Sequence, residues 1–107
     1  MDIGHEDNVT LHREVVTGVL QMIRFAVETI DSGHSPSLRE LCDVGFAEKS
    51  DTAQMFICEY AKDGIINLRV EEARKIIAGD YSSIWSLTNS YLTGFGYDPI
   101  EPVALEI

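Results

Sequence analysis

The 107-residue sequence predicts a single, mainly α-helical domain built around a helix-turn-helix. Ser37 and Glu40 have the S-x-x-E spacing of a capping box, which predicts a short helix that starts at residue 37 and that Gly45 ends. Ser50 is a good N-cap for a second helix over residues 50–62, whose apolar residues recur at helical spacing. Two short helices joined by a glycine-containing turn are typical of a helix-turn-helix.

Further helices are predicted before and after this pair. The first begins near Thr10 and ends near Asp31, because an apolar stripe recurs at helical spacing through it. This stripe consists of Val15 or Val16, Val19, Ile23, Val27 and Ile30. A last helix over residues 80–93 is predicted from Asp80 as N-cap and Gly94 as stop.

The helix-turn-helix region resembles a known family. Residues 33–41 read Gly-His-Ser-Pro-Ser-Leu-Arg-Glu-Leu, which is similar to the G-x-x-P-S-x-R-E-[IL] signature of the LexA repressor's winged helix-turn-helix domain. Gly45-Phe46, Gly64-Ile65-Ile66 and Ala73-Arg74-Lys75-Ile76 resemble later family positions, so the resemblance covers about residues 10–77. It implies a mainly α fold with a small β wing. Residues after 78 do not resemble the family, so the aromatic C-terminal extension of residues 78–107, with its predicted helix, is an addition to the winged domain. The family's self-cleaving peptidase domain has no room in this chain.

Residues 64–77 can be interpreted in two ways. The family spacing from Gly64 to Arg74 favours a β-hairpin wing around Val70-Glu71-Glu72. However, Glu-Glu-Ala-Arg-Lys is composed of strong helix formers, and the turn lacks the Gly or Asn of tight hairpins. We expect the wing from the resemblance, with a helix as the alternative.

The resemblance implies duplex DNA as the partner and the 50–62 helix as the recognition helix. Residues of this helix would meet base edges, and Arg69, Arg74 and Lys75 of the wing would contact phosphates. The candidate DNA-binding residues are Ser37, Arg39, Lys49, Ser50, Asp51, Thr52, Gln54, Met55, Arg69, Arg74 and Lys75. The alternative is an amphipathic helix with an ordinary polar face.

The net charge of −10 argues against nucleic-acid binding, because phosphate contacts need cations. Six of the eight Lys and Arg residues nevertheless lie within residues 34–77. Two functions therefore stay open. One is a small DNA-binding transcription regulator; the other is an acidic protein-binding module that kept the scaffold without DNA binding, as a repressor antagonist or DNA mimic.

The aromatic C-terminal helix favours a homodimer, because it has more apolar surface than one face of a short helix needs. The expected interface consists of Tyr81, Ile84, Trp85 and Tyr91.

No enzyme chemistry, cofactor or metal is expected, since phosphate loops, metal-ligand spacings and nucleophile elbows are missing from the sequence. His5 and His12 are expected in solvent, and Cys42 and Cys58 as reduced, buried thiols. Neither a signal peptide nor a membrane span is recognisable, which favours a cytoplasmic protein.

Overall fold

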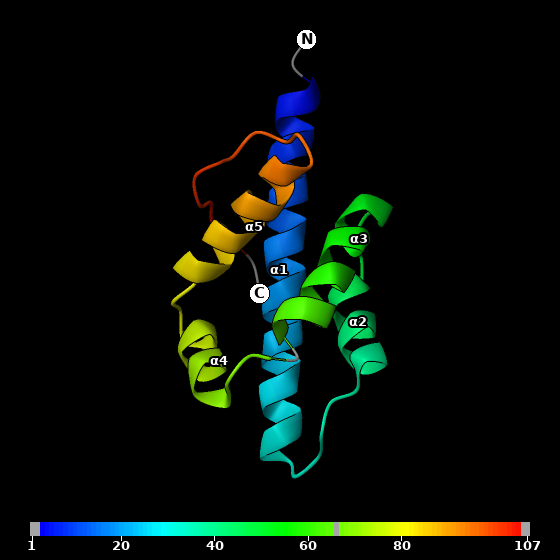
Figure 1. Ribbon diagram of the computed structural model, residues 1–107, viewed down its shortest axis with the longest axis vertical. Coiled ribbons are helices and arrows are strands. Elements are labelled where there is room, and N and C mark those ends of the chain that lie inside the picture. Colours follow the sequence, from blue (N-terminus) through cyan, green and yellow to red (C-terminus); the bar gives the residue numbers. More distant parts are fainter. Residues whose placement is uncertain (1–2, 66, 106–107) are drawn as a thin grey trace.

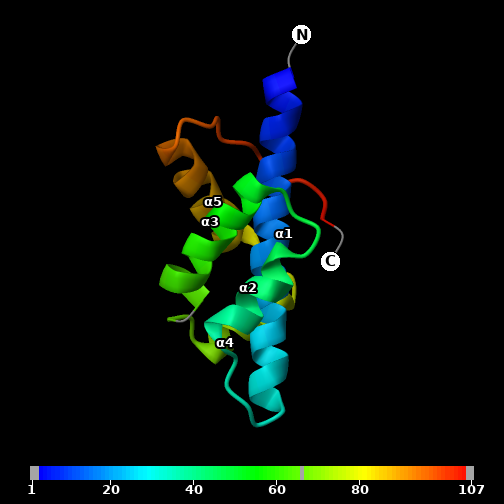
Figure 2. The ribbon, with the colours of Figure 1, turned by 90° about the vertical axis from the view of Figure 1, so that its right-hand side faces the viewer.

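One long helix, α1 (Ile3–Asp31), runs the length of the molecule and contacts every other helix (Figures 1 and 2). The computed structural model describes residues 3–65 and 67–105. A helix of 29 residues is about 43 Å long, which explains the elongated shape of 51 × 25 × 24 Å. The helix begins about two turns before Thr10, the predicted start.

The predicted helix pair is confirmed as α2 (Leu38–Phe46) and α3 (Asp51–Tyr60). The capping box forms as expected: the Glu40 amide donates to Ser37 Oγ at 3.1 Å, and the Ser37 amide donates to Glu40 Oε1 at 3.2 Å. Ser50 caps α3 in the same way, accepting from the Ala53 amide at 3.2 Å. These side chains satisfy amides that a helix start leaves without partners.

Gly45 has a different role from the predicted one. It lies within α2, where an added Cβ would come within 2.8 Å of Met22 and 2.9 Å of Ile57. The missing side chain therefore allows α2 to approach both α1 and α3 closely. The chain turns after Phe46, and Glu48 adopts the left-handed conformation with φ of 60°.

The prediction of a β wing over residues 64–77 is wrong. A π-helical turn (Ala61–Ile65) continues α3, and α4 (Val70–Ile77) takes the place of the hairpin. Residues 3–65 and 67–105 form five α-helices and this π turn, without a strand. The physical reason is local: acidic residues in the first turn of α4 and basic residues in its last turn stabilise the helix dipole.

The last helix, α5 (Ser82–Gly94), lies where one was predicted, but its N-cap is Tyr81 and not Asp80, and no side chain caps it. Two asparagines form hydrogen bonds that connect the segment after Gly94 to α5 and α1. Asn89 donates to the Ile100 carbonyl at 2.8 Å and accepts from its amide at 2.9 Å. Asn8 Nδ2 donates to the Asp98 carbonyl at 2.8 Å, which ties the segment to the beginning of α1.

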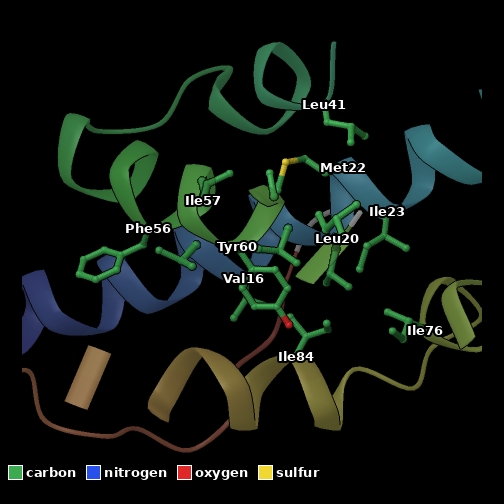
Figure 3. Close-up of a cluster of buried hydrophobic side chains, with 14 of the residues drawn as sticks. Val16, Leu20, Met22, Ile23, Leu41, Phe56, Ile57, Tyr60, Ile76 and Ile84 are labelled. Carbon is green, nitrogen blue, oxygen red and sulfur yellow. The ribbon is translucent and has the colours of Figure 1, made fainter. Parts of the chain in front are cut away.

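The hydrophobic core lies along α1. In Figure 3, Leu20 and Ile23 of α1 meet side chains from three other helices: Ile57 and Tyr60 of α3, Ile76 of α4 and Ile84 of α5. All six side chains are buried. The predicted apolar stripe is correct as far as Val27, whereas Ile30 is 41% exposed. Among the described residues, the helices are too short or too polar to cross a membrane.

Candidate nucleic-acid interface

The outer face of α3 is the surface predicted to contact DNA bases. Ala53, Ile57 and Tyr60 point into the core as expected. The residues that remain accessible on the other side are Asp51, Thr52, Met55 and Glu59, with Gln54 half-buried. Met55 is 50% exposed, so this face presents a methionine between two carboxylates, at intervals of four residues. We refer to Asp51, Met55 and Glu59 as the α3 ridge.

The polar groups before and within α3 are engaged inside the molecule. Lys49 Nζ donates to Gln21 Oε1 at 3.1 Å and to the Ala47 carbonyl at 2.9 Å. Gln54 Nε2 donates to the Lys49 carbonyl at 3.0 Å. A phosphate or an adenine would have to replace these contacts, which reduces the gain from binding DNA.

The N-terminal end of α3 is acidic. The Ser50 amide donates to Glu14 Oε2 at 2.8 Å, and the Ser50 hydroxyl already accepts from Ala53. Asp51 is in the first turn. Residues 35–60 together carry five acidic and two basic residues, a net charge of −3. Such a helix end repels phosphate, although its dipole alone would attract an anion.

The predicted contacts on α4 do not join this face. In Figure 1, α4 lies to the left of α1, whereas α2 and α3 lie to its right. Ser37 is used by the capping box, while Arg39 is exposed at the start of α2. Arg69, directly before α4, and Lys75 on α4 are exposed. The predicted residues are therefore divided between two sides of the molecule.

Arg74 binds a carboxylate of the chain itself. Its guanidinium forms a two-pronged pair with Asp31 at the end of α1, in which Nη1 lies 3.1 Å from Oδ2 and Nη2 contacts Oδ1. The hydrogen bonds of this pair lower the pKa of Asp31 and raise the pKa of Arg74. This pair joins α4 to α1 and leaves Arg74 less available to a phosphate.

The residues predicted for a dimer interface lie mostly inside one chain. Ile84 and Trp85 are 3% and 4% exposed, so the core covers them. Tyr81 and Tyr91 are partly buried against the same core. Tyr91 packs on Tyr60 with ring centroids 6.4 Å apart and donates to Asp63 at 3.3 Å. The exposed apolar residue on this helix is Leu87.

His12 is a buried residue that the sequence did not reveal, since it was expected in solvent. It is fully buried, and its Nδ1 lies 2.7 Å from the Asn8 carbonyl. This carbonyl can only accept, so Nδ1 carries a proton. Groups of three metal-ligating side chains are missing from the described residues. We therefore assign His12 to the core.

The two cysteines are reduced and half-buried rather than buried. Cys42 of α2 lies near Cys58 of α3, and burial together with the neighbouring thiol raises the pKa of Cys42. A raised pKa lowers the thiolate fraction and hence the reactivity. A structural role therefore fits Cys42 better than a nucleophilic one.

Comparison with protein families, curated proteins and solved structures finds no match. The resemblance to the LexA domain thus stays a prediction. What the geometry offers is an acidic α3 ridge, with Lys49 and Arg74 engaged within the chain.

Proposed function

We propose that the protein is an acidic protein-binding module whose α3 ridge contacts a basic surface of another protein. The observation that carries this proposal is that Lys49 and Arg74, two cations of the predicted DNA surface, have partners within the chain. Asp51 and Glu59 of the ridge are exposed, and Glu59 lies 4.0 Å from Lys62 one turn further along the chain. We also propose a cytoplasmic site of action, where Cys42 and Cys58 would stay reduced.

The chemistry of the ridge suits a partner that normally binds nucleic acid. Lys and Arg side chains of such a partner would pair with Asp51 and Glu59, and the flexible Met55 side chain would fill the space between them. The net charge of −10 would accelerate encounter with a basic surface. The protein would then compete with DNA or RNA for its partner.

The proposal is tested with purified basic nucleic-acid-binding domains, each bound to a labelled 30-base-pair duplex. Displacement of the duplex by the protein is measured by fluorescence anisotropy at low and moderate salt. The double variant Asp51→Lys, Glu59→Lys removes the acidic ridge. The matched control, called the α4 control, is Glu71→Lys on α4 combined with Glu101→Lys after the last helix, because both double variants change the net charge by the same amount.

We expect the wild type and the α4 control to displace the duplex and the ridge variant to fail. Equal loss in both variants would mean that only total charge matters, and the α3 ridge would be refuted. Direct binding of the labelled duplex by the protein would refute the protein-binding proposal itself.

The second candidate is a DNA-binding regulator, acting as a dimer. The observation that favours it is the α2–α3 pair with its capping box, together with exposed Thr52 and Met55. If it is correct, Gln54→Ala should cost about 1–3 kcal/mol of DNA binding and relax preference at one base pair. Lys49→Ala should weaken binding to all sequences equally.

A further inference from the structure

A groove on the side of α1 that faces α4 and α5 consists of two adjoining hollows. The first, of about 230 Å³, lies between the C-terminal half of α1, α2 and α4. Its described lining is wholly apolar: Ile23, Ala26, Val27, Ile30, Pro36, Leu41, Ile65, Leu68, Val70 and Ala73. The second hollow, of about 340 Å³, lies between α1, α4 and α5 and shares Ile23 and Leu68 with the first. We call the two together the α1–α4–α5 groove.

The floor of the second hollow is visible in Figure 3, where Ile23, Tyr60, Ile76 and Ile84 face one another from four elements. Its outer part includes Leu87, which is 51% exposed. Most of the lining is buried, and its solvent-accessible part runs from Ile30 in the first hollow through the half-buried Leu68 to Leu87 in the second. Exposed apolar patches mark interaction sites when they are large and rimmed by polar residues.

The rim of the groove is more acidic than basic. Glu72, Asp80 and Lys75 line the second hollow on the α4 side. Asp63, which accepts from Tyr91, directly precedes the lining residue Gly64. Beside the first hollow, Asp31 and Arg74 neutralise each other, and Arg69 lies between the lining residues Leu68 and Val70, so the acidic excess is at the second hollow. The rim therefore attracts cations, as does the net charge of the whole chain.

We propose that the α1–α4–α5 groove binds a basic amphipathic helix of a partner protein. Two adjoining hollows suit two large apolar side chains at positions i and i+3 or i+4 of one helix, which is the pattern by which helices bind in grooves. Lys or Arg residues beside these anchors would lie against Glu72, Asp80 and Asp63.

The sizes of the hollows agree with one anchor in each. An apolar cavity of about 150 Å³ is large enough for benzene. A hollow of 230 Å³ therefore admits a Leu, Met or Phe side chain, and one of 340 Å³ also admits Trp.

The charge of the rim disfavours two other occupants. A second copy of this chain would bring a net charge of −10 toward the acidic rim, and an anionic membrane surface would be repelled in the same way. This groove is separate from the α3 ridge, so the inference does not depend on the function proposed above.

The test is a selection from a phage-displayed library of 18-residue helical peptides, carried out on the full chain. Ala26→Leu fills part of the first hollow, and Ser83→Phe fills part of the second. Ser86→Phe is the matched control, because Ser86 is exposed on the same helix outside the described lining. Circular dichroism and thermal unfolding establish that each variant is folded before binding is compared.

We expect enriched peptides with two large apolar residues three or four apart and Lys or Arg beside them. Their affinity should fall at least tenfold in Ala26→Leu or Ser83→Phe and stay unchanged in Ser86→Phe. The pair Glu72→Gln, Asp80→Asn should weaken binding several-fold at low salt, whereas Glu71→Gln outside the rim should not. If no peptide is enriched, or if enriched peptides bind the filled variants as tightly as the wild type, the groove is not a helix-binding site.

Discussion

At Gly18, α1 approaches α2 and α3 closely, and replacing this residue by alanine should destabilise the protein. A Cβ at Gly18 would lie 2.4 Å from Ile57 Cδ1 and 2.8 Å from the Gly45 carbonyl oxygen. The Ile57 methyl group is the end of a flexible side chain, but the carbonyl belongs to the backbone of α2. The substitution therefore forces α2 away from α1, or strains it.

The loss of stability in Gly18→Ala is the difference between two opposing effects. Overpacking a dense core costs about 1–3 kcal/mol. Replacing glycine by alanine within a helix gains roughly 0.8–1.0 kcal/mol. The sum is a loss of about 1 kcal/mol, which would lower Tm by roughly 4–8 °C in a domain of about this size. Thermal and urea unfolding, followed by circular dichroism, measure this loss.

Gly94→Ala is the control, since no atom lies within 4 Å of its added Cβ. It should leave the stability unchanged or raise it by up to about 1 kcal/mol. The double variant Gly18→Ala, Ile57→Val removes the Cδ1 contact, so its cost should be smaller than the sum of the single costs. If Gly18→Ala stabilises the protein as Gly94→Ala does, α1 and α2 are not in close contact at this point.

Three further predictions concern the ion pair, a buried tyrosine and the C-terminal segment. Asp31→Asn and Arg74→Ala should have non-additive effects on stability, because each removes the same ion pair. The pKa of Asp31 is lowered in the folded state, so the stabilisation by the pair is complete above the unfolded pKa of Asp31 and disappears as pH falls through its folded pKa. Unfolding of the single and double variants at pH 7 and pH 2 measures both effects. Burial raises the pKa of Tyr60 to about 12, so ultraviolet titration should show one tyrosine that ionises at high pH and is missing in Tyr60→Phe. Stability should fall as pH rises from the unfolded pKa near 10 toward 12. Ionisation of Tyr60 near pH 10 would contradict its burial. Asn89→Ala removes both hydrogen bonds to Ile100 and should cost about 1–3 kcal/mol of stability. Amide hydrogen exchange at Ile100 should become faster by more than exchange at Val19 does. Unchanged exchange at Ile100 would show that Asn89 does not position this segment.

Local signals in the sequence were sufficient for four of the five helices. The capping box at Ser37, the N-cap at Ser50 and the periodic apolar residues of α1 act over one or two turns, and the structure contains the helices that they predict. The same rules locate α5, although they place its N-cap at Asp80 and the structure places it at Tyr81. Such signals are visible in sequence because both partners of each interaction are near one another in the chain.

The error at α4 has an equally local explanation. Glu71 and Glu72 precede Arg74 and Lys75, an order that stabilises a helix at both ends. The spacing of the resembling family predicts a wing here, whereas this local chemistry predicts a helix. In the structure Ala73 and Ile76 are buried against the core, so packing reinforces the local preference instead of overriding it.

The burial of the α5 aromatics and the pairing of the basic residues depend on contacts between residues far apart in the chain, which local sequence patterns do not predict. The long α1 and the rest of the core cover Trp85, so the apolar excess of α5 serves the interior of one chain. Likewise, six of the eight basic residues lie within residues 34–77, yet Lys49 is bound to Gln21 and Arg74 to Asp31, both of them on α1. Phosphate binding depends on cations that share an accessible surface. The positions of the cations in the sequence do not show whether they share one. The long α1 binds one of these cations beside α3 and the other on α4, so neither is fully available to a phosphate.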